Sequence, residues 1–376
     1  MVALTAALLC AVALIYPYTL YPLILAKITR GKTKDVWTKH TTSGEKYALF
    51  FCAFNEMHSI KEKIQNLRLL KENYPSLEFF AYDDNSTDGT AEYIEEHAPF
   101  VRLFKNRGRN GKAFGMKLLA SQTTRDYLIF TDANVLLDKD ALRYLEHCYT
   151  DPVIGGVCGK LIYLGEGETT TSKVGGSYWK LEEKIKTLES ATGSVMGADG
   201  SIFSIRRSLY PDFPDTVLDD FTVSMEVVFH GSRLIKCDEV LAYERLISRR
   251  TDEFKRKIRI ATRAFHTHLF LKNRCRKLST IDKFKYTSHK TLRWFGGLSL
   301  VLCIIFFLTA LILTNELLAV TFGTTGLILY IVSIRFDLGV ISSIAEISLA
   351  MIATQLGVLR AINGHTVAIW NPSTSR

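Results

Sequence analysis

The feature that most constrains this chain is the concentration of uncharged, apolar sequence at its two ends. Residues 1–26 contain no charged side chain, and neither do residues 294–315. A helix needs about 20 mostly apolar residues to cross a bilayer. Both runs are long enough, so we expect a transmembrane helix within residues 1–28 and another that begins near residue 294. A buried core helix is the alternative for each.

Two further apolar runs follow near the C-terminus. Residues 317–334 are uncharged but short, and residues 338–359 carry the single charge of Glu346. Because a charge facing lipid is costly, Glu346 should face protein or a water-filled path. We therefore expect two or three spans within residues 294–362. Three spans would place the tail, residues 363–376, across the membrane from the middle of the chain. Two spans with a re-entrant or interfacial segment would leave the tail and the middle of the chain on the same side of the membrane.

Flanking charge sets the expected orientation. The first apolar run has no basic residue before it, and Lys27, Arg30 and Lys32 follow it. Positive flanks stay in the cytoplasm, so we expect an integral protein of a plasma or inner membrane with its middle region in the cytoplasm. A signal peptide would have a basic start and a cleavage site. The seven cysteines show no paired spacing, so neither a disulfide framework nor a zinc site is indicated.

The net charge of +9 is concentrated in residues 245–293, which hold 16 Lys and Arg against three Asp and Glu. Beside a membrane segment, such a block suits anionic lipid headgroups or another phosphate-bearing ligand. No nucleic-acid-binding motif accompanies it, so we expect no nucleic-acid partner. Residues 280–293 interleave Lys with apolar side chains, which is typical of an interfacial helix.

The middle of the chain, residues 40–270, has the pattern of a soluble α/β domain. Short apolar runs at residues 47–54, 77–82, 101–104 and 127–131 alternate with helical patterns at 59–71, 90–97, 112–120 and 139–148. This alternation predicts a mostly parallel sheet with helices on both faces. In such sheets ligands bind at the carboxyl ends of the strands.

Acidic side chains follow the second expected strand. Ser86, Thr87 or Asp88 can cap the helix that follows, but capping does not explain Asp83 and Asp84. A carboxylate at a strand end could accept the N–H of a pyrimidine base or a ribose hydroxyl.

A basic turn precedes the helix that begins near Lys112. Arg107 and Arg109 lie in this turn, and backbone N–H groups at a helix start suit a diphosphate. The alternative is a solvated basic turn, since the glycine spacing is not that of a P-loop.

Asp132 and Asn134 follow the fourth strand. Residues two apart on an extended segment point to the same side. They could hold one face of Mg²⁺ or Mn²⁺, with water and substrate phosphates as further ligands. Asp132 could instead cap the next helix, although Asp138 lies closer to its start.

The adjacent acids Asp219 and Asp220 lie near a further helix start. Acids are favoured there in any case, but two neighbours cannot both be the cap. A carboxylate is a common base for a reacting hydroxyl. In the basic block, cations such as Arg256, Lys257 and Arg259 could hold a leaving diphosphate.

In this order, five segments resemble the family-2 glycosyltransferases, which are inverting enzymes with the GT-A fold. The similar segments are Ala53–Glu56, Asp83–Thr90, Asn110–Ala113, Thr131–Asn134 and Leu218–Phe221. The resemblance covers about residues 45–265. It extends loosely to the membrane helices, whose arrangement is similar to that of synthases for hyaluronan, chitin, cellulose or bacterial exopolysaccharide.

The resemblance implies a role for each matched residue. Asp220 would be the catalytic base, Asp132 with Asn134 would bind Mg²⁺ or Mn²⁺, and Asp199 would contact the acceptor. Arg256, Lys257 and Arg259 would face the acceptor or the diphosphate. Those implied to bind the nucleotide-sugar donor are Ala53, Asn55, Glu56, Asp83, Asp84, Lys112 and Asp132.

Three departures from the family pattern leave the reaction open. Asn134 replaces a second Asp, Asp219 replaces Glu, and the Gln-x-x-Arg-Trp motif of processive synthases is absent, with Arg259 at its expected place. We expect an integral-membrane transferase that moves sugar, from UDP-sugar by preference, to a growing polysaccharide or a lipid-linked acceptor. An inactive export or scaffold subunit and a membrane-surface binding module are the alternatives. The oligomeric state stays open.

Overall fold

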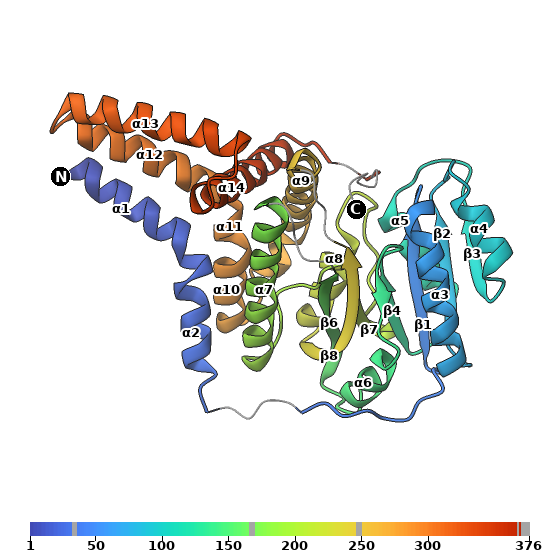
Figure 1. The fold of residues 1–376 in the computed structure, drawn as a ribbon. Coiled ribbons are helices and arrows are strands. Elements are labelled where there is room, and N and C mark those ends of the chain that lie inside the picture. Colours follow the sequence, from blue (N-terminus) through green and yellow to red (C-terminus); the bar gives the residue numbers. More distant parts are fainter. Residues whose placement is uncertain (32–35, 165–169, 246–249, 367, 370–376) are drawn as a thin grey trace.

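The computed structural model describes residues 1–31, 36–164, 170–245, 250–366 and 368–369. The loop expected at residues 165–172 lies mostly outside this range, as does most of the C-terminal tail. Within the range the chain folds into an α/β domain with a layer of apolar helices at one end (Figure 1).

The described residues form one eight-stranded sheet in the order β3-β2-β1-β4-β7-β6-β8-β5. Its strands are β1 Tyr47–Ala53, β2 Glu78–Asp83, β3 Val101–Lys105, β4 Tyr127–Thr131, β5 Leu136–Leu137, β6 Ile154–Leu164, β7 Ile202–Arg206 and β8 Arg233–Arg245. The four strands expected from the sequence correspond to β1 to β4.

The sheet is mixed. β1 to β4 pair in parallel, which confirms the expected arrangement for that half, but β7 runs antiparallel to both β4 and β6. β6 and β8 are parallel to each other. Because β7 reverses the direction twice, β1, β2, β4, β6 and β8 all present their carboxyl ends at the same edge. That edge is where ligand-binding residues are expected.

Helices cover both faces of the sheet, and all seven residues of β1 are buried, as two-sided burial requires. One core lies beneath α3, α4 and α6, and the other beneath α5, α8 and α9. These helices are α3 Met57–Asn73, α4 Thr90–His97, α5 Lys112–Ser121, α6 Ala141–Cys148, α8 Asp219–Phe229 and α9 Arg250–Cys275. The helix α7 Thr170–Ala191 precedes β7.

The terminal segments form the remaining helices. They are α1 Val2–Ile15, α2 Leu20–Ile28, α10 Thr280–Tyr286, α11 Leu292–Trp294, α12 Gly296–Ile312, α13 Glu316–Arg335 and α14 Val340–Ile362. Among the described residues, α13 and α14 are each long and apolar enough to cross a membrane. The count rises to four if two bent pairs are single spans, one at the N-terminus bent by 49° and one joining residues 280–294 to α12, bent by 62°. The limits expected for the membrane segments stay predictions.

The helix α14 lies along α9 of the α/β domain (Figure 1). At Gly357 the helices approach so closely that a Cβ would lie 2.6 Å from the Cβ of Ala261. Glu346 is buried, accepts a hydrogen bond from Thr171 at 3.0 Å and pairs with Arg250. The prediction that Glu346 faces protein is therefore confirmed.

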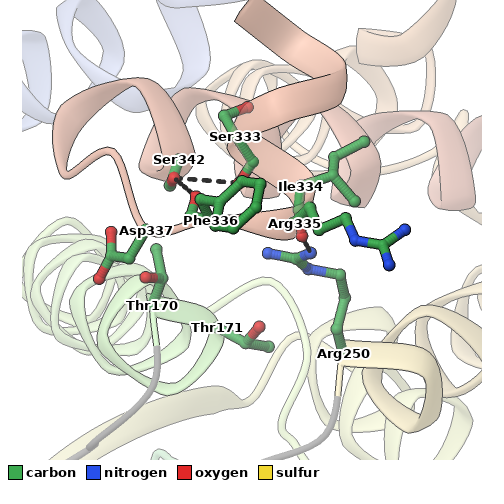
Figure 2. A pocket seen from close by; sticks show the side chains of 9 residues that line it. All are labelled: Thr170, Thr171, Arg250, Ser333, Ile334, Arg335, Phe336, Asp337 and Ser342. Atoms are coloured by element: carbon green, nitrogen blue, oxygen red, sulfur yellow. Dashed lines mark hydrogen bonds between the residues drawn. The ribbon is translucent and has the colours of Figure 1, made fainter.

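A pocket of about 240 Å³ lies at this boundary between α7, α9, α13 and α14. Figure 2 shows the guanidinium of Arg250 and the hydroxyls of Thr170 and Thr171 beside the turn that carries Phe336 and Asp337. The side chains that line it hold the apolar helices against the α/β domain.

The end of the described chain returns to the α/β domain. After α14, Thr366 Oγ1 donates to the backbone oxygen of Thr216 at 3.0 Å. The carbonyl of Ala368 lies against Gly111 so closely that a Cβ there would overlap it. Gly111 also has φ +88°, a conformation that glycine adopts without strain.

Candidate active site

Four residues from separate elements meet at the carboxyl edge of the sheet. Lys112 opens α5, Asp132 follows β4, Gly200 precedes β7 and Asp220 lies in the first turn of α8. Lys112 Nζ donates to Asp132 Oδ1 at 2.6 Å. A Cβ on Gly200 would lie 2.8 Å from Lys112 Nζ, 3.2 Å from Asp220 Oδ2 and 3.5 Å from Asp132 Oδ2. Only glycine leaves the space between these three groups open.

The charges of this group act on one another. Burial acts to lower the pKa of Lys112, but the carboxylates led by Asp132 and Asp219 raise it above its ordinary value. The ammonium is therefore permanently charged. Burial, followed by the charge of Asp219, raises the pKa of Asp220 to about 7. A carboxyl with this pKa is well matched to proton transfer near neutral pH.

Asp84 organises the basic turn before α5. Its carboxylate is fully buried and accepts hydrogen bonds from Arg109 Nε at 2.8 Å, Asn110 N at 2.7 Å and Gly111 N at 3.0 Å. Three donors from consecutive residues fix the path of this turn. Asp84 thereby sets the position of the helix start rather than standing open to a ligand.

Asp83 differs from Asp84 because one of its carboxylate oxygens accepts no hydrogen bond in the described part of the chain. Its Oδ2 accepts from the backbone N–H of Ser86 at 2.9 Å, while Oδ1 is buried and has no hydrogen-bond partner within the described part of the chain. A buried acceptor without a donor is costly. Asp83 thus offers a free acceptor at the carboxyl end of β2.

Asn55 and Glu56 fasten two loops together. Asn55 Oδ1 accepts from Thr87 N at 2.8 Å, and Glu56 N donates to Thr90 Oγ1 at 3.0 Å. The carbonyl of Ala53 accepts a hydrogen bond from the backbone N–H of Asp84 at 2.9 Å. These contacts join the loop after β1 to the loop after β2, and so shape the edge on which Asp83 lies.

The residues expected to bind a metal offer few ligands of their own. Asn134 donates its amide to Glu244 Oε1 at 2.7 Å, and Asp132 Oδ1 is taken by Lys112. No cluster of three His, Cys, Asp or Glu able to hold a metal occurs among the described residues. Asp132 Oδ2 on a side chain that is 40% exposed fits a cation completed by phosphate and water, which is the usual pattern for Mg²⁺.

Asp199 lies immediately before Gly200 and is held on both oxygens. Lys186 donates to Oδ2, and Ser201 donates its hydroxyl and its backbone N–H to Oδ1. Burial acts to raise the pKa of Asp199, but Lys186 holds it below its ordinary value. Asp199 therefore fixes the loop that carries Gly200.

The basic residues expected to contact the diphosphate lie on α9 with acidic partners of their own. Arg256 makes two hydrogen bonds to Glu253 at 2.8 and 3.0 Å, and Lys257 Nζ lies 3.1 Å from the same carboxylate. Arg259 is half-buried on the same helix. Arg256 and Lys257 are therefore paired with a carboxylate of their own helix.

Two contributors were missed from the sequence. The only indication of Gly200 in the sequence was its position next to Asp199. Arg263, on α9, is buried and donates to the backbone oxygen of Val217 at 2.9 Å, next to the turn that bears Asp220. No pattern in the sequence distinguished Arg263 from the other cations of the basic block.

The arrangement can now be compared with known proteins. Residues 49–213 match the family model described as glycosyl transferase family 2. The chain carries a family 2 glycosyltransferase domain. Asp83, Lys112, Asp132 and Gly200 lie within the matched range of this glycosyltransferase domain, and Asp220 lies beyond it.

Curated relatives match the same region. Poly-β-1,6-N-acetyl-D-glucosamine synthase of Staphylococcus aureus is 28% identical over 206 residues, and that of Staphylococcus epidermidis is 26% identical over 200 residues. The first match covers 50% of this chain and 47% of the relative. The chain therefore spans about half the length of the curated relatives it matches.

One solved structure resembles nearly the whole chain. The mannosyltransferase PcManGT from Pyrobaculum calidifontis, in complex with GDP-Man and Mn²⁺, superposes with a TM-score of 0.74 and 20% identity. The match covers 95% of this chain and 99% of that one. At this identity it shows a shared fold, in which the glycosyltransferase domain is GT-A-like.

Proposed function

We propose that the chain is a membrane-anchored inverting glycosyltransferase. It transfers a sugar from a nucleoside-diphosphate sugar, UDP-sugar by preference, to a hydroxyl of a polysaccharide or lipid-linked acceptor. The observation that carries this proposal is the meeting of Lys112, Asp132 and Asp220 around Gly200. A cation, a metal-binding carboxylate and a base of raised pKa are the groups that this transfer needs.

Donor binding is assigned to the edge formed by β2, β4 and α5. The free oxygen of Asp83 accepts an N–H of the base or a ribose hydroxyl. The start of α5 and Lys112 receive the diphosphate. Asp132, with the amide oxygen of Asn134, holds Mg²⁺ or Mn²⁺, and that cation would neutralise charge on the diphosphate.

Asp220 is the proposed base. It accepts the proton of the acceptor hydroxyl as that oxygen forms a bond to the anomeric carbon. The bond from that carbon to the diphosphate oxygen breaks on the opposite face, and the electron pair leaves with the diphosphate. Attack opposite the leaving group inverts the anomeric configuration. The permanent charge of Lys112 favours the departing anion.

Three observations support the membrane arrangement that we propose. α12 and α13 expose apolar side chains, and α1 packs against α12. α14 instead lies along α9, and Thr366 beyond it bonds to Thr216 of the glycosyltransferase domain. We therefore assign α12 and α13 as spans, and α14 as an interfacial helix although its length and composition would allow a crossing. This assignment keeps the C-terminal tail on the cytoplasmic side.

The first experiment measures nucleotide release by the purified chain in nanodiscs. UDP-, GDP- and CMP-sugars are tested with Mg²⁺, Mn²⁺ or EDTA, in the presence of cell lipid extract as acceptor source. Release from one donor that requires metal and falls at least about 100-fold in Asp220→Asn supports the proposal. Asp126→Asn, an exposed acid far along the sequence from the base, is the matched control and should match the parent.

The same experiment tests the inactive-scaffold alternative. Absence of both release and donor binding, with a protein that remains folded, would contradict the transferase proposal and favour the scaffold. Equal release by Asp220→Asn and the parent would contradict the role of Asp220 as base.

A further inference from the structure

A buried histidine lies between two buried carboxylates of α7. His289 follows α10, and its Nε2 lies 2.8 Å from Glu182 Oε1 while its Nδ1 lies 2.8 Å from Glu189 Oε1. All three side chains are nearly inaccessible to solvent. Both ring nitrogens of His289 therefore lie within hydrogen-bond distance of a glutamate oxygen, which fixes the orientation of the ring.

The two glutamates are held in their ionised form. Burial acts to raise the pKa of both carboxyls, but the charge of His289 lowers it below the ordinary value. Arg293 adds a hydrogen bond to Glu182 Oε2 at 2.6 Å, and Lys290 Nζ lies 3.9 Å from Oε1. Each buried carboxylate of this cluster is thus paired with a basic side chain, as burial of charge requires.

Glu189 connects this network to the loop that leads into the active site. Its Oε2 accepts the backbone N–H of Met196 at 3.0 Å. Met196 begins the run that continues through Asp199 to Gly200. A single carboxylate therefore contacts the ring of His289 on one side and the active-site loop on the other.

The same carboxylate also reaches the N-terminal helix. The hydroxyl of Tyr21 on α2 donates to Glu189 Oε1 at 2.6 Å, and Tyr21 is fully buried. Tyr21 and Leu25 pack against Ile185 of α7. α2 is thus docked on the glycosyltransferase domain, and a bend of 49° separates it from α1.

A buried lysine also contacts the loop between α7 and β7. Lys285, one turn before His289, is fully buried and donates to the carbonyl of Ser194 at 2.7 Å. Lys285 and His289 therefore fix the loop at two points, directly at Ser194 and through Glu189 at Met196. Residues 192–201, which connect α7 to β7, have little freedom to move independently.

The position of this loop controls the open space at the reaction centre. The space exists because Gly200 has no side chain, and a Cβ would already be 2.8 Å from Lys112 Nζ. A shift of the loop by about 1 Å would close that space or draw it away from Asp220. Misplacement of that size can lower a rate by about 100-fold.

We propose that Glu189, His289 and Tyr21 are positioning residues, which hold residues 196–200 at the reaction centre and make its geometry depend on the docking of α2. This proposal rests on the proposed glycosyl transfer, because it concerns the geometry of that site. It assigns to the N-terminal segment a role in catalysis besides anchoring. None of the three residues needs to touch donor or acceptor.

The test compares variants of graded severity in the full chain in nanodiscs. Tyr21→Phe removes one hydroxyl and preserves the packing. Glu189→Gln retains an oxygen for Met196 N–H, whereas Glu189→Ala does not. Tyr16→Phe is the matched control, because the Tyr16 hydroxyl pairs with Ser288 at 3.1 Å and not with Glu189. Nucleotide release gives kcat, calorimetric titration with the donor gives Kd, and hydrogen–deuterium exchange reports on the amides of residues 193–200.

A positioning role predicts a selective loss. Glu189→Ala should lower kcat about 100-fold, with Glu189→Gln recovering most of it, and Tyr21→Phe should lower kcat about 5-fold. Donor Kd should stay within twofold, because Asp83 and Lys112 lie on other elements. Exchange at residues 193–200 should accelerate in Tyr21→Phe and Glu189→Ala but not in Tyr16→Phe.

Two results would overturn the inference. One is a Tyr21→Phe variant with parental kcat and parental exchange in this loop. The other is a loss of donor affinity and melting temperature in proportion to kcat, which is the behaviour of a purely structural residue. If Glu189→Ala does not fold, Tyr21→Phe alone decides. Failure of the proposed function is recognised separately, because the parent would then release no nucleotide while the exchange comparison could still be made.

Discussion

At the scale of single residues, the reaction centre depends on the absence of a side chain at Gly200. Lys112, Asp132 and Asp220 come from three elements, and the distance between them is kept by Gly200. The two acids that look alike in sequence, Asp83 and Asp84, have different surroundings. Asp84 is saturated by the turn before α5, whereas Asp83 keeps a buried acceptor free.

Gly200→Ala tests whether this open space is required. The added methyl would lie 2.8 Å from Lys112 Nζ and should break its bond to Asp132. We expect nucleotide release to fall about 100-fold with little change in melting temperature. Gly176→Ala on α7, where a Cβ meets nothing within 4 Å, is the control. Parental release by Gly200→Ala would show that the centre tolerates a side chain there.

Lys63 should make stability depend on pH. It is fully buried beneath β4, donates to the carbonyl of Val135 at 2.6 Å, and burial lowers its pKa to about 7. The unfolded chain has a lysine pKa of about 10.4. Between these values the unfolded state binds the proton more tightly, so stability rises from about pH 7 to about pH 10, and this contribution is absent below about pH 7.

Lys63→Met isolates that contribution. The melting temperature of the parent in detergent should rise between pH 7 and pH 9.5 more steeply than that of Lys63→Met. Because other groups titrate equally in both proteins, the difference in slope belongs to Lys63. Parallel curves would mean that the buried amine is not neutral above pH 7.

At the scale of elements, the contact between α14 and α9 joins the apolar helices to the glycosyltransferase domain. Gly357→Leu would place a side chain where even a Cβ lies 2.6 Å from Ala261. Overpacking of this kind typically costs about 1–3 kcal/mol. We expect a lower melting temperature in nanodiscs, while Gly326→Leu on α13, which has open space, should match the parent. An unchanged melting temperature in Gly357→Leu would show that α14 is not seated on α9.

The helices and strands also show which parts of the fold could be predicted from the sequence alone. β1 to β4 and the helices between them were predictable, because alternating apolar patterns and strand-end acids are local signals. The reversal at β7 was not, because pairing between residues 127–131 and 202–206 is non-local. The pairing of Glu253 with Arg256 and Lys257 is by contrast local, because these residues lie three and four positions apart on one helix.

At the scale of the whole molecule, we propose one topology. The bent N-terminal helix pair, α12 and α13 would cross the membrane, while α14 stays against α9 and the chain returns to Thr216. An epitope appended to the C-terminus should therefore be reachable by antibody only after the cell membrane is permeabilised, like the glycosyltransferase domain. An epitope appended before Met1 should be reachable in intact cells. Surface labelling of the C-terminal epitope would instead mean that α14 is a third C-terminal span.

The contact between Ala368 and Gly111 also has a consequence for the order in which the molecule is completed during synthesis. The turn that opens α5 is translated long before the residues that cover it. A nascent chain that stops short of Ala368 could thus hold every strand-end acid and still lack part of the enclosure around that turn. Maturation of the site would then wait for the synthesis of Ala368 and the settling of α14.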